Sequence, residues 1–599
     1  MVVVLAVAAG TAWALLPWLV SSETVQTAIE RELGNFFGTP ATLGGRTEVT
    51  VFPRPRARLS DVAIAAPDGG DAPILSAERL EAEVGLFSLL RGRPRFSSFL
   101  LVRPHVRLVR SDTGAIDWRS STGRIGRLFA RRHAEPGDDA HGEDAGDRLG
   151  TVVTEHGRIT LLADDGETLE TFTSIDASIV WPRIDAPLSV SASGIWRGTS
   201  ATLEFATQSP ADFFFGEPTK TTVAIVSEIA ELRFDGAANL GGGPFADGPI
   251  EFSTPSMRGL MTVLDRQLPA SRALGSVDLA GPMRLAQQRL RFEALDISVD
   301  GNAGTGVLEI ALPTPGRSPS VTGTLDFASL DIGAFLSAFI EIPHGGGDNK
   351  PVGPGFVARP DADLRVSATN ARFGELSLTN LAATAQVTRD SAIFDIGDAE
   401  AYGGHAQARL QLSTEPYPGR AEVIVSGQQV DTARLDQAMA LPRALPRGLG
   451  DFSITVNAPI ASWREMARNA QGKVSIEMTA GVMPGLGLDT LMNSTGTTRY
   501  FSLDTQARAP GFASARIHGE VRDGVVSLDD ALVSYPDGNV MLRGIVSHGG
   551  SLALTAFAQP APPAQGEGLG PQEPTRFFIG GSWNRPFATH VTSAPERRD

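Results

Sequence analysis

Residues 452–457 read FSITVN, and residues 474–480 read VSIEMTA. In both stretches every second residue is apolar and its neighbours are polar. This alternation is typical of a β-strand with one apolar and one solvated face, and such strands usually form antiparallel sheets. We predict two strands here that share one apolar face. The residues of that face are Phe452, Ile454, Val456, Val474, Ile476 and Met478.

The same alternation recurs along most of the chain. It is present, for example, at residues 201–205 and 364–369. Gly, Asp and Asn punctuate the strands, as at 164–166 (DDG), 523–524 (DG) and 537–539 (DGN), and these residues favour hairpin turns. The sequence therefore predicts a mainly β protein.

Helical patterns are few and short. Apolar residues recur at helical spacing within 22–37, after serines that suit a helix start. We favour a helix that covers the open end of a sheet, over one that lies at a membrane. Shorter helices are expected at 254–267, from 330, from 430 and at 462–470.

An apolar residue followed by Asp occurs at Leu330–Asp331 and again at Val430–Asp431, each time before a helical pattern. We interpret this as a weak internal repeat of several strands plus a short helix. Stacked repeats of this kind predict an elongated, curved antiparallel sheet.

The first twenty residues, MVVVLAVAAGTAWALLPWLV, contain no charged residue. A helix of this length covers roughly 30 Å, the thickness of a bilayer's hydrocarbon core. We predict a single transmembrane anchor over residues 1–20. Its membrane-anchoring residues are Val2, Val3, Val4, Leu5, Val7, Leu15, Leu16, Trp18, Leu19 and Val20.

A cleaved signal peptide is the competing interpretation of this segment. Residues 12–14 (AWA) match a small-residue cleavage site, but the apolar run continues to Val20 and no basic segment precedes it. Either interpretation takes the rest of the chain across a membrane, so we expect an extracytoplasmic function.

Composition excludes several function classes. The chain has 599 residues, a formal net charge of −16 and no cysteine. Disulfides, thiolate metal sites and cysteine nucleophiles are therefore absent, and the negative charge argues against a nucleic-acid partner. Residues 46–132 differ, with sixteen Arg against nine Asp and Glu. These arginines either contact anionic lipid or occupy the wet face of strands.

Composition also predicts the domain organisation. We expect an anchor at 1–20, an amphipathic helix at 21–38, a first β domain at 39–343, a linker at 344–355 (HGGGDNKPVGPG) and a second β domain at 356–599. Residues 131–149 and 560–574 are expected to be loops within these domains.

No catalytic or metal-binding pattern survives inspection. The chain has no G-x-S-x-G, H-E-x-x-H or Walker motif, and its nine His are scattered. We therefore expect no catalytic residues, no metal, no cofactor and no enzymatic activity.

Several short stretches, in their order and spacing, resemble the AsmA family of Gram-negative envelope proteins. The stretches are 51–55 (VFPRP), 59–62 (LSDV), 77–82 (AERLEA), 86–90 (LFSLL), 104–108 (PHVRL), 114–118 (GAIDW), 402–404 (YGG) and 580–586 (GGSWNRP). The resemblance implies one inner-membrane anchor, a β-rich body in the periplasm and a role in outer-membrane biogenesis. It also implies a likeness to chorein-type repeating β-groove proteins, which carry lipids along an apolar trough. On this resemblance the candidate lipid-facing residues are Phe452, Ile454, Val456, Val474, Ile476 and Met478.

Three functions remain open at this point, and the third, an enzyme with an unrecognised site, is the least favoured. The first is a groove that holds or transports phospholipid, which needs a continuous apolar trough. The second is a non-enzymatic assembly factor that binds outer-membrane proteins through exposed β edges, which needs a packed core and a free edge.

Overall fold

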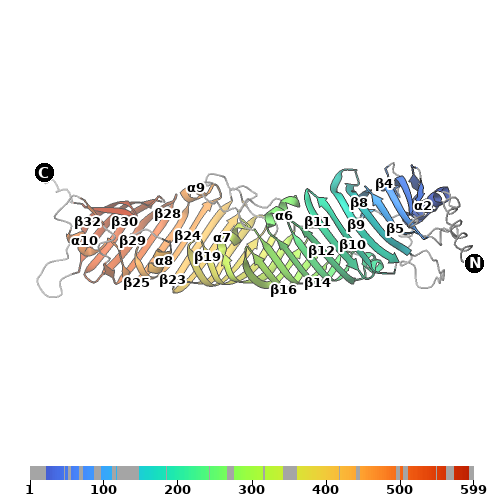
Figure 1. Ribbon diagram of the computed structural model, residues 1–599. Helices are drawn as coiled ribbons and strands as arrows, with labels where there is room; N and C mark the ends of the chain where they lie inside the picture. The colour runs from blue at the N-terminus through green and yellow to red at the C-terminus, as the bar shows by residue number, and fades with distance from the viewer. Residues whose placement is uncertain are drawn as a thin grey trace, which may run out of the picture. The chain divides into compact units, whose positions relative to one another are not determined.

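In the computed structural model the chain forms two compact units. Unit 1 comprises Met1–Asp265 and Ser276–Phe292, and unit 2 comprises Arg266–Gly275 and Glu293–Asp599. The structure describes residues 22–45, 47–50, 56–66, 72–85, 96–110, 116–117, 148–183, 185–241, 243–265, 275–314, 318–340, 361–416, 419–439, 445–493, 500–503, 510–547, 549–561 and 573–591. Both units consist mainly of β-strands with a few short helices (Figure 1).

The helices in the described part of unit 1 are α2 (Ser22–Phe37), α5 (Pro210–Phe215) and α6 (Met257–Val263). Its strands are β1 (Ala41–Leu43), β2 (Glu48–Thr50), β3 (Arg56–Ile64), β4 (Leu75–Val84), β5 (Phe96–Val102), β6 (His105–Arg110), β7 (Ile116–Asp117), β8 (Arg148–Ala163), β9 (Thr168–Arg183), β10 (Leu188–Trp196), β11 (Thr199–Thr207), β12 (Thr219–Ser227), β13 (Glu231–Asn239), β14 (Phe245–Thr254) and β15 (Val277–Ala286).

Sequential antiparallel pairing dominates unit 1. From β8 to β15 each strand pairs with the next along the chain. The exceptions are β5 and β6, which both run parallel to the long strand β8. Antiparallel neighbours need only short turns, which explains why Gly and Asp punctuate the sequence so often.

The division between the units falls inside β16 (Arg289–Val299). The helices of unit 2 are α7 (Ile332–Ser337), α8 (Thr432–Met439), α9 (Trp463–Arg468) and α10 (Leu488–Asn493). Its strands are β17 (Asn302–Ala311), β18 (Ser320–Asp331), β19 (Asp361–Phe373), β20 (Leu376–Val387), β21 (Ser391–Ala401), β22 (Gly404–Ser413), β23 (Arg420–Asp431), β24 (Arg447–Pro459), β25 (Gln471–Val482), β26 (Phe501–Ser502), β27 (Gly511–Phe512), β28 (Ser514–Arg522), β29 (Val525–Tyr535), β30 (Gly538–Ser547), β31 (Ser551–Pro560), β32 (Thr575–Ser582) and β33 (Arg585–His590).

Unit 2 is also antiparallel, with one parallel pair, β18 and β19. Its alternation is as regular as the sequence predicts: Leu364, Val366 and Ala368 on β19 are buried, whereas Asp363 and Arg365 are exposed. The hairpins predicted at 523–524 and 537–539 join β28 to β29 and β29 to β30. The expectation of a mainly β, antiparallel fold is thus confirmed.

β-Bulges interrupt the long strands in both units. His156 on β8 has a positive φ of 55°, and its N–H donates to Asp176 Oδ1 at 2.8 Å on β9. Gln429 on β23 repeats this arrangement, with φ 55° and a 2.7 Å hydrogen bond to Asp451 Oδ1 on β24. A bulge bends its strand and increases the local twist, so these residues curve the sheet of their own unit.

Short helices follow strands in a recurring pattern. Asp331 ends β18 and caps α7, since its Oδ1 accepts the Ala334 N–H at 2.9 Å. Asp431 ends β23, and its Oδ1 accepts the Ala433 N–H at 3.0 Å at the start of α8. These are the two Asp residues at which the sequence indicated a repeat. Unit 1 uses serine caps instead, before α5 and α6.

Helix α2 occupies the same residues as the amphipathic helix predicted at its position. Ile29 is fully buried against β3 and β4, in a cluster that includes Leu59 and Leu80. The helix therefore covers one apolar end of the sheet in unit 1.

The arginines of the basic segment that the structure describes mostly lie in ion pairs with glutamates. Arg56 Nη2 lies 2.8 Å from Glu83 Oε1, and Arg58 Nε lies 3.0 Å from Glu81 Oε1, across β3 and β4. These side chains lie on the wet strand face. Their ion pairs explain the arginines in this part of the segment without a lipid ligand.

Several predicted features lie outside the described ranges. They include the anchor at 1–20, the linker at 344–355 and most of the loops at 131–149 and 560–574. The contact-based division into units falls earlier, near residue 292. Among the helices that the structure describes, none is both long and apolar enough to span a bilayer.

Candidate functional site

One face of the unit 2 sheet carries an unbroken row of directly paired apolar residues, here called the first row. Directly paired residues point to the same side of a sheet. The first row consists of Gly306, Leu325, Val366, Ala383, Ile396, Ala408, Val425, Ile454, Val474, Gly519, Leu528, Gly544, Leu554, Ile579 and Ala588. It crosses every strand of unit 2 from β17 to β33 except the two-residue strands β26 and β27.

A second row runs beside the first, two residues away on each strand. It consists of Leu308, Gly323, Leu364, Ala385, Phe394, Leu410, Val423, Val456, Gly472, Val521, Val526, Val546, Leu552, Gly581 and Pro586. Neither row contains a polar side chain. At about 4.8 Å between strands, such a row is on the order of 70 Å long, several times the depth of one bilayer leaflet.

Some positions in the rows are glycine because neighbouring backbone comes very close. A Cβ atom at Gly472 would overlap the carbonyl oxygen of Thr455, and one at Gly544, whose φ is 138°, would overlap that of Ala553. These glycines therefore leave the two rows free of polar side chains at positions where no larger side chain would fit.

The middle of the two rows is only partly buried. We call Leu410, Val423, Val425, Ile454, Val456 and Val474 the central stretch. Val423 is 39% exposed, and the other five are half-buried. Apolar side chains of a packed core are normally removed from water, so a partly exposed strip of this length is available to an apolar ligand.

Helix α7 covers the rows on the side of β18 to β21. Phe335 packs edge-on against Phe339 with ring centroids 5.3 Å apart, and Phe339 lies 5.9 Å from Phe394 of the second row. Val366 and Phe394 beneath this cover are 3% and 7% exposed. The apolar face is closed here.

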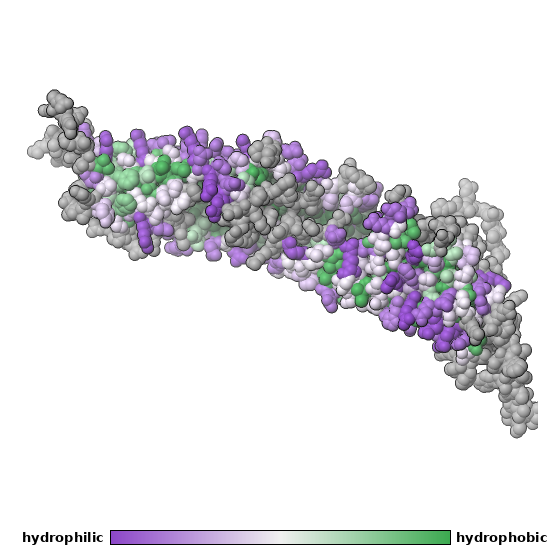
Figure 2. Space-filling view, turned by 90° about the horizontal axis from the view of Figure 1, so that it is seen from above, coloured by the Kyte–Doolittle hydropathy of each residue, from purple (hydrophilic) through white to green (hydrophobic). Residues whose placement is uncertain are grey.

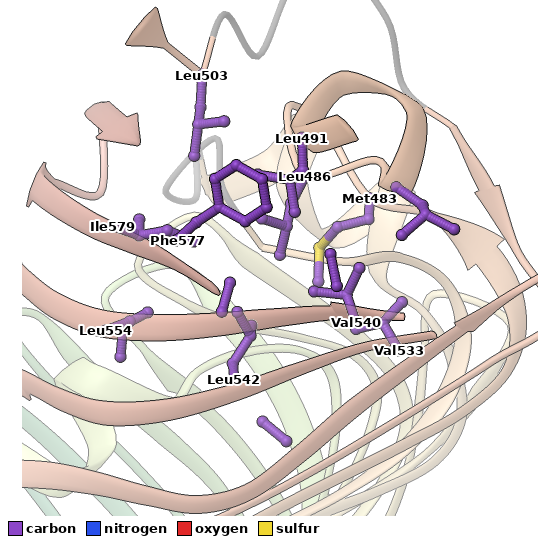
Figure 3. Close-up of a cluster of buried hydrophobic side chains, with 14 of the residues drawn as sticks. Met483, Leu486, Leu491, Leu503, Val533, Val540, Leu542, Leu554, Phe577 and Ile579 are labelled. Atoms are coloured by element: carbon purple, nitrogen blue, oxygen red, sulfur yellow. The ribbon is translucent and has the colours of Figure 1, made fainter. Parts of the chain in front are cut away.

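A second cover closes the face over the last strands. It consists of residues 483–493, which include α10, and residues 500–503. Figure 3 shows Met483, Leu486 and Leu491 of this cover meeting Val533, Val540 and Phe577 of the sheet. Leu491 and Phe577 are both fully buried. We call this segment the C-terminal cover.

Between the C-terminal cover and the sheet lies an apolar cavity of about 210 Å³. Its sheet side is lined by Val474, Ile476, Leu528 and Leu554, and Trp583 also lines the cavity. An apolar cavity of roughly 150 Å³ stays free of water and accepts a small hydrocarbon. This space therefore suits a short hydrocarbon segment, and it begins at strand β25, where the central stretch ends.

Tyr535 ties the C-terminal cover to strand β29. Its hydroxyl donates a hydrogen bond to the carbonyl oxygen of Leu486. Burial, with a smaller contribution from Asp537, raises the pKa of Tyr535 well above its ordinary value. The phenol therefore stays neutral and keeps donating over the whole physiological pH range.

All six candidate lipid-facing residues lie on one face of β24 and β25. Ile454 pairs with Val474, and Phe452 pairs with Ile476. Five of the six are half-buried; Met478 is 3% exposed and belongs to the packed core beneath the C-terminal cover. The ten predicted anchor residues lie outside the described ranges.

Sequence reasoning missed the C-terminal cover. Its signal is present but short: Leu488, Leu491 and Met492 have helical spacing, directly after the Pro- and Gly-rich residues 484–487. These Pro and Gly residues suggest a loop. The segment instead folds back over the sheet, because Leu486 and Leu491 become buried there.

Unit 1 has an apolar row of its own. It consists of Ala57, Ala82, Phe99, Val152, Ile179, Val190, Phe205, Val223, Phe234 and Ile250. Val190, Phe205 and Val223 are half-buried, while the opposite face of the same strands carries Ser191, Glu204 and other polar residues. The arrangement of unit 2 is therefore repeated.

No candidate metal centre emerges from the part of the chain that the structure describes. It contains no group of three His, Asp or Glu side chains placed to hold a metal ion. The rows themselves offer hydrocarbon contacts alone.

Comparison with known proteins gives one match. The model of the AsmA family matches residues 348–531, which include β19 to β25, β28 and most of β29. This region contains the whole central stretch. No curated protein and no solved structure matches the chain.

Proposed function

We propose that this chain, whose residues 348–531 match the model of the AsmA family, is a cell-envelope protein that binds phospholipid acyl chains along the apolar face of its sheet. The observation that carries the proposal is the central stretch. There, two adjacent rows without a polar side chain are only partly buried across β22 to β25. Acyl chains are the abundant envelope ligand that needs apolar contact and no hydrogen bond.

The covers and the rows suggest how a lipid lies. In the central stretch the acyl chains rest on the two rows while the charged headgroup stays in water beyond the open side. The cavity under the C-terminal cover can take a hydrocarbon end but no headgroup, since its lining is almost wholly apolar. Lipid moves by sliding along the rows, because no side chain there holds it by a specific polar contact.

We place this activity in the periplasm, with residues 1–20 as an uncleaved inner-membrane anchor, and we propose no enzymatic step. The charge-free run of residues 1–20 supports the anchor. Protease digestion of spheroplasts, with N-terminal sequencing, tests this placement. A body protected from protease, or a mature chain beginning after residue 14, contradicts it.

The acyl-chain proposal is tested by the double substitution Ile454→Asp and Val456→Asp. Both side chains are only partly buried, so we expect water to reach the carboxylates and the fold to be retained. An acyl chain would have to lie against the charges, which is costly. We expect the purified full-length variant to melt as a folded protein and to carry much less co-purified phospholipid, measured by mass spectrometry, than the wild-type chain.

Ser453→Asp is the matched control, because Ser453 lies on the opposite, exposed face of the same strand. It should leave the lipid content unchanged. If the wild-type chain carries no phospholipid and the double variant unfolds, the face is a core. The second function considered for this chain, an assembly factor acting through β edges, would then take its place.

A further inference from the structure

Several large apolar side chains gather on the outer face of strands β30 to β33 in unit 2. Here "outer" means the face opposite to the two apolar rows. Large apolar side chains are exposed on it: Ile545 by 48%, Phe578 by 37% and Phe587 by 36%, with Tyr500 beside them at 70%. We call these four residues the aromatic patch. Figure 2 shows hydrophobic residues gathered on the surface of this part of unit 2, at the left.

The patch is contiguous. Ile545, Ala553, Gly580 and Phe587 are paired in one row across the four strands. Gly580 leaves space that the two phenylalanine rings fill, since a Cβ there would lie 2.8 Å from both Phe578 and Phe587. The Tyr500 ring meets the Phe587 ring edge-on at 6.4 Å.

Aromatic side chains often cover the exposed backbone of a nearby strand glycine. Phe578 and Phe587 cover Gly580 in this way, which explains part of the arrangement. This role does not explain Tyr500, which is mostly in water, or Ile545, which lies two strands away.

Within strands β30 to β33 the charged side chains are of one sign, whereas Asp529 and Asp530 lie exposed at the bulge of the neighbouring strand β29, opposite Arg543. Residues 538–560 and 575–591 contain Arg543, Arg576 and Arg585 and no Asp or Glu, although the chain as a whole carries −16. All three arginines are exposed. Asp537 and Glu573 lie just outside these strands.

None of the three arginines forms an ion pair within the described part of the chain, and Arg576 instead lies 5.8 Å from the Phe557 ring centre. On earlier strands, by contrast, Arg409 pairs with Asp395 at 3.3 Å.

We propose that the aromatic patch and its arginines dock onto the surface of a phospholipid bilayer that contains anionic headgroups. Aromatic side chains favour the headgroup region, and arginines near the surface are attracted to anionic lipid. The flat strand face offers area and no pocket, which fits a lipid surface better than a folded ligand.

This docking proposal rests on the proposed function, because docking would serve the binding of acyl chains. The inner side of the same strands lines the apolar cavity, so docking brings one end of the apolar face to a membrane.

The absence of cysteine allows a site-specific test in the full-length chain. A single Tyr500→Cys substitution carries an environment-sensitive fluorophore, and the protein is held in phosphatidylcholine nanodiscs so that residues 1–20 are already accommodated. We add vesicles of phosphatidylcholine and phosphatidylglycerol in equal parts, or of phosphatidylcholine alone. The label should brighten and shift to the blue with the anionic vesicles only.

The matched control is the same label at Arg365→Cys, on the exposed outer face of β19, which should not respond. We then add Arg543→Ser and Arg576→Ser to the labelled Tyr500→Cys protein. The vesicle concentration that gives a half-maximal response should rise roughly thirtyfold, which corresponds to about 1 kcal/mol per arginine. Both arginines are exposed, so the melting temperature should not change.

No response at Tyr500→Cys, an equal response with neutral vesicles, or an unchanged response after removal of the arginines would each overturn the docking proposal. Co-purified phospholipid, measured on the same proteins, reports the acyl-chain proposal separately. The arginine variant should keep its lipid, so the two proposals can fail independently.

Discussion

Side-chain exposure along the apolar face determines whether a given residue belongs to a core or to a groove. Leu412 on β22 is fully buried, whereas Ile454 on β24, on the same apolar face, is half-buried. Both are aliphatic residues of similar size. The free energy that each contributes to folding should therefore follow its burial and not its chemistry.

Truncation to alanine measures this difference. Leu412→Ala should lower the free energy of unfolding by about 2–5 kcal/mol, since it leaves a cavity in a packed site. Ile454→Ala should cost clearly less than about 2 kcal/mol, because part of its surface is already in water. Denaturant unfolding of the two full-length variants gives the comparison. Equal costs would mean that the central stretch is as closed as the rest of the face.

At the scale of the element, the strand–Asp–helix unit holds the cover formed by α7 in place. Asp331 accepts the Ala334 N–H and also lies 3.1 Å from Arg372 Nη2. Partial burial alone would raise the pKa of Asp331, but the hydrogen bonds from the Ala334 N–H and Arg372 outweigh it and lower that pKa. The ionised carboxylate is therefore the stabilising form.

Asp331→Ala should destabilise unit 2 by about 1 kcal/mol at neutral pH, the usual cost of losing a helix N-cap. A lowered pKa in the folded state means that this stability is present above the unfolded-state pKa and is lost as the pH falls through the folded-state pKa. The difference in the free energy of unfolding between the Asp331→Ala variant and the wild-type chain should therefore shrink in acid. Asp331→Asn retains the cap and should cost less; an Asn variant as unstable as the Ala variant would contradict the capping role.

Local signals made several elements predictable. Alternation predicted the strands of unit 2. Helix α9 begins after Ser462, which forms a reciprocal capping box with Glu465 inside the helix, at the position expected for a helix. Helix α5 was missed although Ser209, Pro210 and Gly216 mark its start and end. Its six residues are too few to show a helical period.

At the scale of the whole molecule, sequence alone could not settle what covers the apolar face. Alternation reports that a strand has an apolar side, which Ile454 and Leu364 share, but only tertiary contacts decide that Leu364 is buried under a cover and Ile454 is not. The parallel pairing of β18 with β19 and the division near residue 292 depend on long-range contacts in the same way.

The family match covers the central stretch, so the central claim for the whole chain is that lipid occupies this strip in the living cell. Val423 is 39% exposed on the apolar face, and its neighbour Ile424 points to the opposite face. The two positions therefore form a matched pair.

The most direct measurement is photo-crosslinking in intact cells with a light-activated amino acid at Val423 or Ile424 of the full-length chain. Mass spectrometry of the purified protein should find a phospholipid adduct at Val423 and little or none at Ile424. No adduct at Val423, or equal adducts at both positions, would contradict the account.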